Sequence, residues 1–284
     1  MFRLVNVGSR PALEHAGAVY DVARLADDDS LATATACLAR FEELHELAHH
    51  CEGAEPDGLL DALVLGPPVP DARQVFGIGL NYQSHAEESG MELPPAPLTF
   101  TKFPSCLAGP TTDVALSGAV GDYEAEVVVV IGRTCRHVPE GAAWDVVAGL
   151  TAGQDISDRE VQLAGSPPQF CLGKSFGAYG PTGPAVVSVD AFEDPDDVAL
   201  RCEVWGEVVQ ESSTAQLIFG VPQLVSYLSS ICTLYPGDLI FTGTPDGVGM
   251  ARGRFLSPGD EIVTTVETVG ELRNRCTGPE EEVR

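Results

Sequence analysis

Two acidic residues at alternate positions lead into the most apolar segment of the chain. Glu124 and Glu126 lie in the segment 122–132 (DYEAEVVVVIG), whose aliphatic run is typical of a buried strand. Because side chains two apart in a strand point to one face, both carboxylates project together at the mouth of a sheet. Two ionised carboxylates repel each other in a site of low dielectric constant, and a bound cation relieves that repulsion. The alternative is an exposed acidic strand end that binds no metal.

A third acid, Asp155, ends a predicted strand over residues 149–156. Three carboxylates from two strand ends leave positions around a hard cation for water and substrate. Carboxylate oxygens favour Mg²⁺, with Mn²⁺ or Ca²⁺ as alternatives, over zinc. Asp155 could instead be a turn residue or a helix N-cap.

His85 and Glu88 lie three positions apart in a predicted helix over residues 84–90. This spacing places them on one helix face, where a carboxylate orients an imidazole and raises its basicity. Such a pair suits a general base that acts on water, although a surface His–Glu pair is the alternative. The segment 88–95 that follows is predicted to be a mobile lid.

Sixteen residues are basic, and only Lys102 and Lys174 are lysines. Lys174 has apolar neighbours and is predicted to be an inward ammonium near a site, whereas Lys102 could equally be an edge-strand lysine. The Gly-Lys-Ser triplet at 173–175 lacks the upstream glycine of a phosphate-binding loop, which excludes that motif. Thr244 follows a predicted strand, and its loop is predicted to bind a carboxylate or to be a plain tight turn.

Composition narrows the class of protein. The 284 residues carry a net charge of −26, which disfavours nucleic acid and membrane surfaces as partners. No run of about 18 apolar residues occurs, and the eight cysteines form no C-x-x-C pair. We therefore predict a cytoplasmic, reduced protein that acts on a small molecule.

The chain divides by pattern into two units. Residues 1–70 are predicted to form a small α/β domain, with strands near 2–7 and 18–22 and helical periodicity over 30–50. Residues 71–284 are predicted to form a larger, mainly β domain folded around a site. Its predicted strands are 75–80, 97–102, 113–116, 123–131, 149–156, 184–188, 199–204, 207–210, 238–242 and 261–269, and its predicted helices are 84–90, 139–147, 157–163 and 221–231. The predicted class is therefore α+β, mainly β.

Taken in order, the motifs resemble those of the fumarylacetoacetate hydrolase family. The resemblance covers residues 72–275, and residues 1–70 are similar to the small N-terminal unit of many bacterial members. It is carried by Gly79-Leu80-Asn81-Tyr82 with His85 and Glu88, Asp122-Tyr123-Glu124-Ala125-Glu126, Gln154-Asp155-Ile156-Ser157 with Arg159, Gly173-Lys174-Ser175-Phe176, Gly183-Pro184 and the long segment 236–249.

The resemblance implies a fold of rolled mixed sheets with a few peripheral helices, assembled as a homodimer. It implies a Mg²⁺, Mn²⁺ or Ca²⁺ ion held by Glu124, Glu126 and Asp155. The expected catalytic residues are His85, Glu88 and Lys174. The expected substrate-binding residues are Tyr82, Lys102, Arg159, Gln162 and Thr244.

The favoured activity is cleavage of a carbon–carbon bond in a 1,3-dicarbonyl or acylpyruvate-type acid. The metal would stabilise an enolate leaving group as a Lewis acid, and His85 would activate water. The first alternative keeps the site but omits water attack: decarboxylation or tautomerisation of an oxaloacetate-like acid, or lyase or isomerase chemistry on a sugar-derived or ureidoglycolate-like acid. A non-catalytic relative is the second alternative, and it predicts a broken site.

Overall fold

Three sheets make up the computed structural model, which describes residues 1–88, 90 and 92–279. The strands are β1 Arg3–Val7, β2 Arg10–His15, β3 Ala18–Asp21, β4 Gly58–Leu59, β5 Leu65–Gly66, β6 Val75–Gly79, β7 Leu98–Thr101, β8 Leu107–Ala108, β9 Val114–Ala115, β10 Gly121–Asp122, β11 Ala125–Ile131, β12 Val147–Gln154, β13 Ser157–Asp158, β14 Gly180–Ser188, β15 Ala199–Val204, β16 Glu207–Ser213, β17 Leu239–Phe241, β18 Glu261–Val266 and β19 Gly270–Thr277. The α-helices are α1 Val22–Ala26, α2 Ala34–Leu38, α3 Phe41–His50, α4 Gln83–Glu88, α5 Arg159–Gln162, α6 Phe170–Gly173, α7 Val221–Ile231 and α8 Gly249–Arg252.

The twelve-stranded sheet has the order β4-β3-β2-β1-β14-β12-β11-β17-β6-β7, with β5 beside β1 and β8 beside β14. Its central strand β11 is buried on both faces. Val128 and Val130 pack into a cluster shared with the N-terminal helices, whereas Val127 and Val129 pack toward the five-stranded sheet. Burial on both faces explains why the sequence of this strand is a continuous aliphatic run instead of an alternation of apolar and polar residues.

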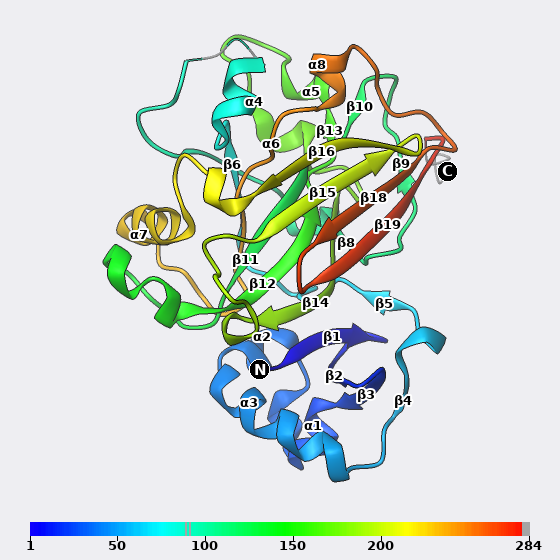
Figure 1. Ribbon diagram of the computed structural model, residues 1–284, viewed down its shortest axis with the longest axis vertical. Helices are drawn as coiled ribbons and strands as arrows, with labels where there is room; N and C mark the ends of the chain where they lie inside the picture. The colour runs from blue at the N-terminus through cyan, green and yellow to red at the C-terminus, as the bar shows by residue number, and fades with distance from the viewer. Residues whose placement is uncertain (89, 91, 280–284) are drawn as a thin grey trace.

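Residues 1–70 lie at the lower end of the molecule in Figure 1. Their strands extend the large sheet, because β1 pairs antiparallel with β14 and sets Leu4 opposite Val186. Helices α1, α2 and α3 bury Val22, Leu38 and Leu44 against the same sheet. The division of the chain at residue 70 remains a prediction.

The five-stranded sheet has the order β16-β15-β18-β19-β9 and packs its apolar face on β11, β12 and β14. Strands β15 and β16 form the hairpin predicted at Trp205-Gly206, and both turn residues have positive φ (59° and 73°). Such values match the right-handed twist of a two-residue hairpin. Trp205 is held in this conformation by a hydrogen bond from Nε1 to Asp260 (2.9 Å) and by Arg254, 3.6 Å from its ring.

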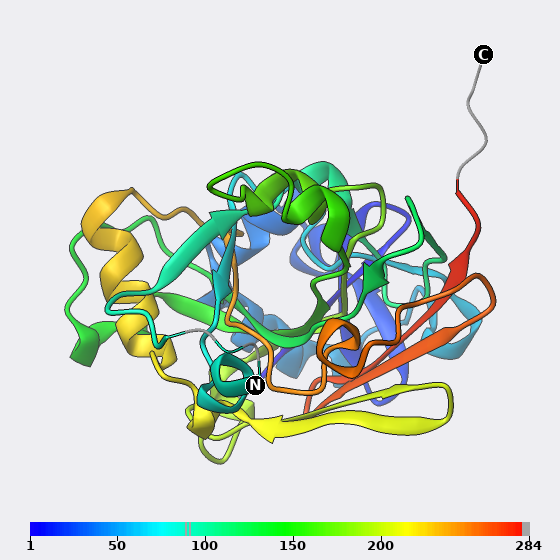
Figure 2. The same cartoon turned by 90° about the horizontal axis from the view of Figure 1, so that it is seen from above.

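Short helices gather at the end of the sheets opposite the N-terminal unit. Helices α4, α5, α6 and α8 all lie there in Figure 1, and Figure 2 shows them from above around one end of the central strands. Segments that are far apart in sequence therefore meet at the ends of β11 and β12.

The predicted class, α+β and mainly β, is confirmed. Several details were wrong or missed. Residues 139–147 form two short 3-10 turns and the start of β12 instead of a helix, because Pro139 and Gly141 interrupt the helical pattern. The strand predicted over 261–269 ends at Val266 as β18, and strands β2 and β19 and helix α6 were not predicted. No helix of the described residues is long and apolar enough to cross a membrane.

Candidate metal centre

Four buried carboxyl groups converge where β11 and β12 meet. Asp122, Glu124 and Glu126 alternate along one stretch of chain, and Asp155 follows β12, which pairs with β11. The backbone N–H of Asp155 donates to the carbonyl of Glu124 (2.9 Å), which fixes the two segments side by side. One carboxylate oxygen each from Glu124, Glu126 and Asp155 lies within 4.8 Å of the other two.

Lys174 reaches into this cluster from the end of α6. Its Nζ donates to Glu124 Oε2 (2.7 Å), Asp155 Oδ2 (2.8 Å) and Ser157 Oγ (2.8 Å). All three ammonium hydrogens therefore have acceptors. The side chain is inward and 2% exposed, as its apolar sequence neighbours indicated.

Lys102, the other lysine of the chain, approaches Asp155 from the opposite side. Its Nζ donates to Asp155 Oδ1 (2.6 Å), to the carbonyl of Tyr179 (3.1 Å) and to the carbonyl of Lys174. The ammonium is fully buried, and Asp155 raises its pKa although burial alone would lower it. Lys102 has no hydrogen left for a substrate, so we now assign it to orienting Asp155.

Arg159 links Glu124 to the fourth carboxylate, Asp122. Its Nε donates to Asp122 (2.8 Å), its Nη2 lies 2.7 Å from both Asp122 and Glu124, and its Nη1 donates to Gln162 Oε1 (2.8 Å). Asp122 also accepts two backbone N–H groups from the start of α8, at 2.6 and 2.9 Å. Through these hydrogen bonds Asp122 links Arg159 of α5 and the start of α8 to the segment that carries Glu124 and Glu126.

The two glutamates have opposite electrostatic surroundings. Burial opposes ionisation of Glu124, but the cations of Lys174 and Arg159 outweigh it and lower the pKa of Glu124 to about 2. Burial raises the pKa of Glu126 well above its usual value, and the negative charges of Asp155 and Glu124 raise it further. Among the described residues, no lysine, arginine or histidine forms an ion pair with Glu126.

These groups fit a hard divalent cation. The three clustered ligand groups are all carboxylates, and one of them lacks a cationic partner. Asp122, Glu124, Glu126 and Asp155 oppose only three permanent cations in the cluster, so one negative charge is left over. Mg²⁺, Mn²⁺ and Ca²⁺ prefer such an oxygen-only set, whereas a structural zinc site uses cysteine or histidine.

His85 and Glu88 lie on one face of α4, as their spacing predicted. His85 Nδ1 is 3.0 Å from Glu88 Oε1, and the Glu88 carboxylate accepts the backbone N–H of Gly247 at 3.0 Å. A carboxylate at Nδ1 favours the tautomer with hydrogen on Nδ1, which leaves Nε2 free to accept a proton. Of the predicted lid that follows, Ser89 and Met91 lie outside the described residues.

The loop after β17 supports Glu126 and the pocket wall. Gly243 donates its N–H to Glu126 Oε2 (2.7 Å). Its φ is +107°, and a Cβ there would lie 2.8 Å from the Cβ of Asn81, so glycine is required. The hydroxyl of Thr244 donates to the carbonyl of Ala125 (2.9 Å) and accepts from Gln210. That hydroxyl therefore has no hydrogen free for a substrate carboxylate.

Tyr82 is fully buried and does not line the pocket. Its hydroxyl has no hydrogen-bond partner among the described residues. Burial raises the pKa of Tyr82, and the nearby charge of Glu126 adds to the rise. Direct contact with substrate, which we predicted for Tyr82, would require movement of the residues that cover it.

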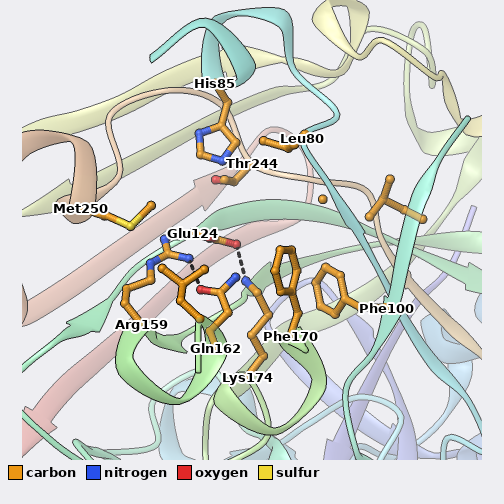
Figure 3. A pocket seen from close by; sticks show the side chains of 13 residues that line it. Leu80, His85, Phe100, Glu124, Arg159, Gln162, Phe170, Lys174, Thr244 and Met250 are labelled. Atoms are coloured by element: carbon orange, nitrogen blue, oxygen red, sulfur yellow. Dashed lines mark hydrogen bonds and ion pairs between the residues drawn. The ribbon is translucent and has the colours of Figure 1, made fainter. Parts of the chain in front are cut away.

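A pocket of about 240 Å³ opens above Glu124. Figure 3 shows the imidazole of His85 over its mouth, with Glu124, Arg159, Gln162 and Lys174 at its floor. Phe100 and Phe170 form a wall on the side of Lys174 away from Arg159. The lining residues are Ile78, Gly79, Leu80, His85, Phe100, Glu124, Arg159, Gln162, Leu163, Phe170, Lys174, Thr244 and Met250.

Sequence reasoning missed three supporting residues. Asp122 anchors Arg159, Ser157 accepts from Lys174, and Asn81 donates to the carbonyls of Thr242 (2.7 Å) and Phe219. Asp122 was detectable, because it continues the alternation of Glu124 and Glu126. Asn81 and Ser157 act through contacts that no local spacing reveals.

Comparison with known proteins agrees with this geometry. The family model for the C-terminal part of fumarylacetoacetate hydrolase matches residues 74–277. A Dictyostelium discoideum protein named fumarylacetoacetate hydrolase domain-containing protein 2 homolog is 42% identical over 214 residues, which are 71% of this chain and 70% of that protein. The mitochondrial oxaloacetate tautomerase Fahd2a of Rattus norvegicus is 39% identical over 212 residues, 73% of this chain and 67% of the relative.

Solved structures resemble nearly the whole chain. A candidate HpcE protein from Mycobacterium smegmatis has a TM-score of 0.91 and 44% identity, covering 98% of this chain and 100% of the other. Maleylpyruvate hydrolase from Sphingobium sp. SYK-6, in complex with manganese(II) and pyruvate, has a TM-score of 0.83 and 26% identity, covering 98% and 100%. The predicted resemblance is thereby confirmed: the chain belongs to the fumarylacetoacetate hydrolase family.

Proposed function

We propose that this protein is a metal-dependent hydrolase that cleaves the carbon–carbon bond between the acyl group and the pyruvate unit of an acylpyruvate-type acid. The observation that carries the proposal is the pairing of two features around one pocket. Glu124 lines the floor of the pocket and forms, with the buried Glu126 and Asp155, a carboxylate cluster that suits a cation, and His85 lies over the mouth with Glu88 beside it.

Glu124, Glu126 and Asp155 would hold the divalent ion. When bound, the ion supplies a Lewis acid next to the oxygens of a 2-oxo acid and thereby favours the enolate form of the pyruvate unit. Mg²⁺ is the ion we propose, with Mn²⁺ or Ca²⁺ as alternatives. The solved structure of maleylpyruvate hydrolase contains manganese(II) and pyruvate together, which supports this pairing of ion and 2-oxo acid.

His85 Nε2 is the proposed base. It would take a proton from water while the water oxygen bonds to the acyl carbonyl carbon. The bond from that carbon to the methylene carbon then breaks, and its electron pair passes into the enolate of pyruvate. The methylene carbon takes the proton from His85, so the products are a carboxylic acid and pyruvate. Glu88 would hold the Nδ1–H throughout and stabilise the charged imidazole.

The other polar residues have distinct proposed tasks. Gln162 Oε1 accepts a hydrogen bond from Arg159, and no acceptor for Gln162 Nε2 occurs among the described residues, so we assign this amide N–H as a donor to a substrate carbonyl. Lys174 lines the pocket with its three ammonium hydrogens engaged, so we assign it to positioning the ligand carboxylates in place of the oxyanion contact expected from sequence. Arg159 Nη2 lies 2.7 Å from Asp122 and from Glu124 but has no hydrogen-bond partner among the described residues, so we keep it as a donor to the substrate.

A second candidate is tautomerisation of oxaloacetate. It is favoured by the rat relative, whose name is oxaloacetate tautomerase. The reaction needs the same cation and a base such as His85, but no water attack. Nuclear magnetic resonance of the products separates the candidates, since hydrolysis of an acylpyruvate releases pyruvate and a carboxylic acid in equal amounts.

The test compares the wild-type protein with Glu126→Ala and the matched control Glu271→Ala. Glu126→Ala is expected to abolish pyruvate release and Mg²⁺ uptake together, whereas Glu271, a surface acid on β19, leaves both unchanged. Full activity of metal-free Glu126→Ala protein contradicts the proposal. Absence of pyruvate release from a panel of acylpyruvates, with oxaloacetate turned over, favours the tautomerase.

Two further expectations accompany this function. The homodimer implied by the family is tested by light scattering at several protein concentrations. The cytoplasmic location is tested by cell fractionation. The rat relative is named as mitochondrial, so fractionation should also include mitochondria.

A further inference from the structure

We infer that the acyl group of the substrate is apolar and uncharged, so that the substrate carries a single carboxylate. The inference rests on the proposed function and adds the chemical class of the group that is cleaved off. Its evidence is the wall of the pocket and the charge balance around its floor.

The wall that faces away from Arg159 is aromatic and aliphatic. Phe100 and Phe170 meet edge to face, with ring centroids 5.9 Å apart. Ile78 and Leu80 continue this surface from β6 and the turn after it. Leu163 closes the rim from the end of α5 and is 46% exposed. An acyl chain that extends from the floor toward this wall exchanges water for apolar contacts.

The cationic groups that line the pocket are already paired. Lys174 has three acceptors, and Arg159 lies against two carboxylates and the amide of Gln162. Within the described residues, the wall beyond them contributes no lysine or arginine. A second carboxylate on the substrate would therefore be desolvated there without a counter-ion, which is unfavourable.

The charge of the cluster leads to the same conclusion. When all four carboxylates are ionised, they oppose three cations, which leaves one negative charge. A divalent cation would change that to one positive charge, and the carboxylate of a 2-oxo monoacid would neutralise it. A dicarboxylate would leave an excess negative charge in a buried site.

Calorimetry with oxamates tests the inference on the intact chain in the presence of Mg²⁺. Oxamate is an unreactive mimic of a 2-oxo acid, and its nitrogen carries groups of chosen chemistry. N-isopentyl oxamate and N-(2-carboxyethyl) oxamate have arms of the same shape, and only the second has a charge. We expect the isopentyl compound to bind at least about tenfold more tightly than both the carboxyethyl compound and oxamate itself.

The outcomes distinguish this inference from the proposed function. If oxamate binds but the carboxyethyl compound matches the isopentyl compound within tenfold or exceeds it, the inference is overturned and the proposed function stands. If no oxamate produces heat with Mg²⁺ present, the 2-oxo acid site itself is refuted, and the inference falls with it.

A pair of variants provides a second measurement. Leu163→Arg introduces a cation at the rim, and we expect it to bring the two Kd values together or to reverse their order. Leu172→Arg is the matched control, because Leu172 is 64% exposed on α6 and does not line the pocket, and we expect it to preserve the wild-type preference. Equal thermal melts show that both variants fold. An unchanged preference in folded Leu163→Arg contradicts the placement of the acyl group.

Discussion

Replacing Lys102 by methionine tests the electrostatic design of the site most directly. The side chain is fully buried, and its ammonium donates to Asp155 Oδ1 (2.6 Å) and to two backbone carbonyls. Methionine has a similar length and no charge, so the substitution removes the cation with little change of volume. Asp155 then keeps only Lys174 as a cationic partner.

The expected cost follows from this burial. Removing one partner of a buried ion pair typically costs about 3–5 kcal/mol, because the remaining charge is left without compensation. For a chain of this size that corresponds to a fall in Tm of about 6–10 °C. A divalent cation at the carboxylates would restore part of the missing positive charge. Mg²⁺ is therefore expected to raise the Tm of Lys102→Met by more than it raises the Tm of the wild-type protein.

The assay is thermal and urea unfolding, followed by circular dichroism with Mg²⁺ and with EDTA. Arg133→Met is the matched control, because Arg133 forms an ion pair with Glu42 on the surface and its loss is expected to cost less than about 1 kcal/mol. The double variant Lys102→Met/Asp155→Asn is expected to recover part of the loss. A loss below about 1 kcal/mol in EDTA, or an equal response to Mg²⁺ in variant and wild type, refutes the reasoning.

Three further changes have defined outcomes. Gly243→Ala would place a methyl group 2.8 Å from a neighbouring Cβ at a φ of +107°, so urea unfolding should show a loss of about 1–3 kcal/mol, accompanied by weaker Mg²⁺ binding. Glu88→Gln removes the charge that orients His85, so kcat of the proposed hydrolysis should fall at least tenfold with a smaller change in KM. The hydrogen bond from Arg10 lowers the pKa of Asp21 in the folded protein. The ionised Asp21 carboxylate therefore stabilises the fold above about pH 4, and this stabilisation is lost as the pH falls through the pKa of Asp21 in the folded state. In Asp21→Asn, the free energy of unfolding in urea should depend less on pH in that range.

Controls accompany these changes. A Cβ at Gly278 meets nothing within 4 Å, so Gly278→Ala should leave stability and Mg²⁺ binding unchanged. Glu87 accepts a hydrogen bond from Gln83 on the exposed side of α4, so Glu87→Gln should preserve kcat. An unchanged kcat in Glu88→Gln argues against His85 as the base. A wild-type pH profile in Asp21→Asn argues against that ion pair as a source of acid sensitivity.

The strands that sequence reasoning found are those whose burial follows a simple pattern. β11 was predicted because both faces are buried and nearly every residue is aliphatic. β19 was missed although Leu272, Asn274 and Cys276 alternate inward, because the buried Asn274 disguises the pattern. Its amide nitrogen donates to the carbonyl of Thr112 (2.9 Å) and lies near that of Pro110. That partner is more than 150 residues away and leaves no local signal.

The same distinction holds for the site. The convergence of Glu124 and Glu126 follows from the period of a strand, and the place of His85 beside Glu88 follows from the period of a helix. The partners of the two lysines depend on where β7 and α6 lie relative to β12, which is a matter of tertiary register. For that reason we expected Lys102 to contact the substrate, whereas in the structure its ammonium donates to Asp155.

The distribution of these cations bears on how the protein folds before it meets a metal. Lys102, Lys174 and Arg159 together neutralise three of the four buried acids. Burial and the charges of Asp155 and Glu124 raise the pKa of the remaining acid, Glu126, which therefore takes up a proton more readily than an ordinary glutamate. We therefore expect the protein to fold without the ion, in contrast to small domains that are unfolded without their metal. The ion would then enter a cluster in which the two lysines already hold Glu124 and Asp155 in place, and it would compete with Lys174 for their oxygens.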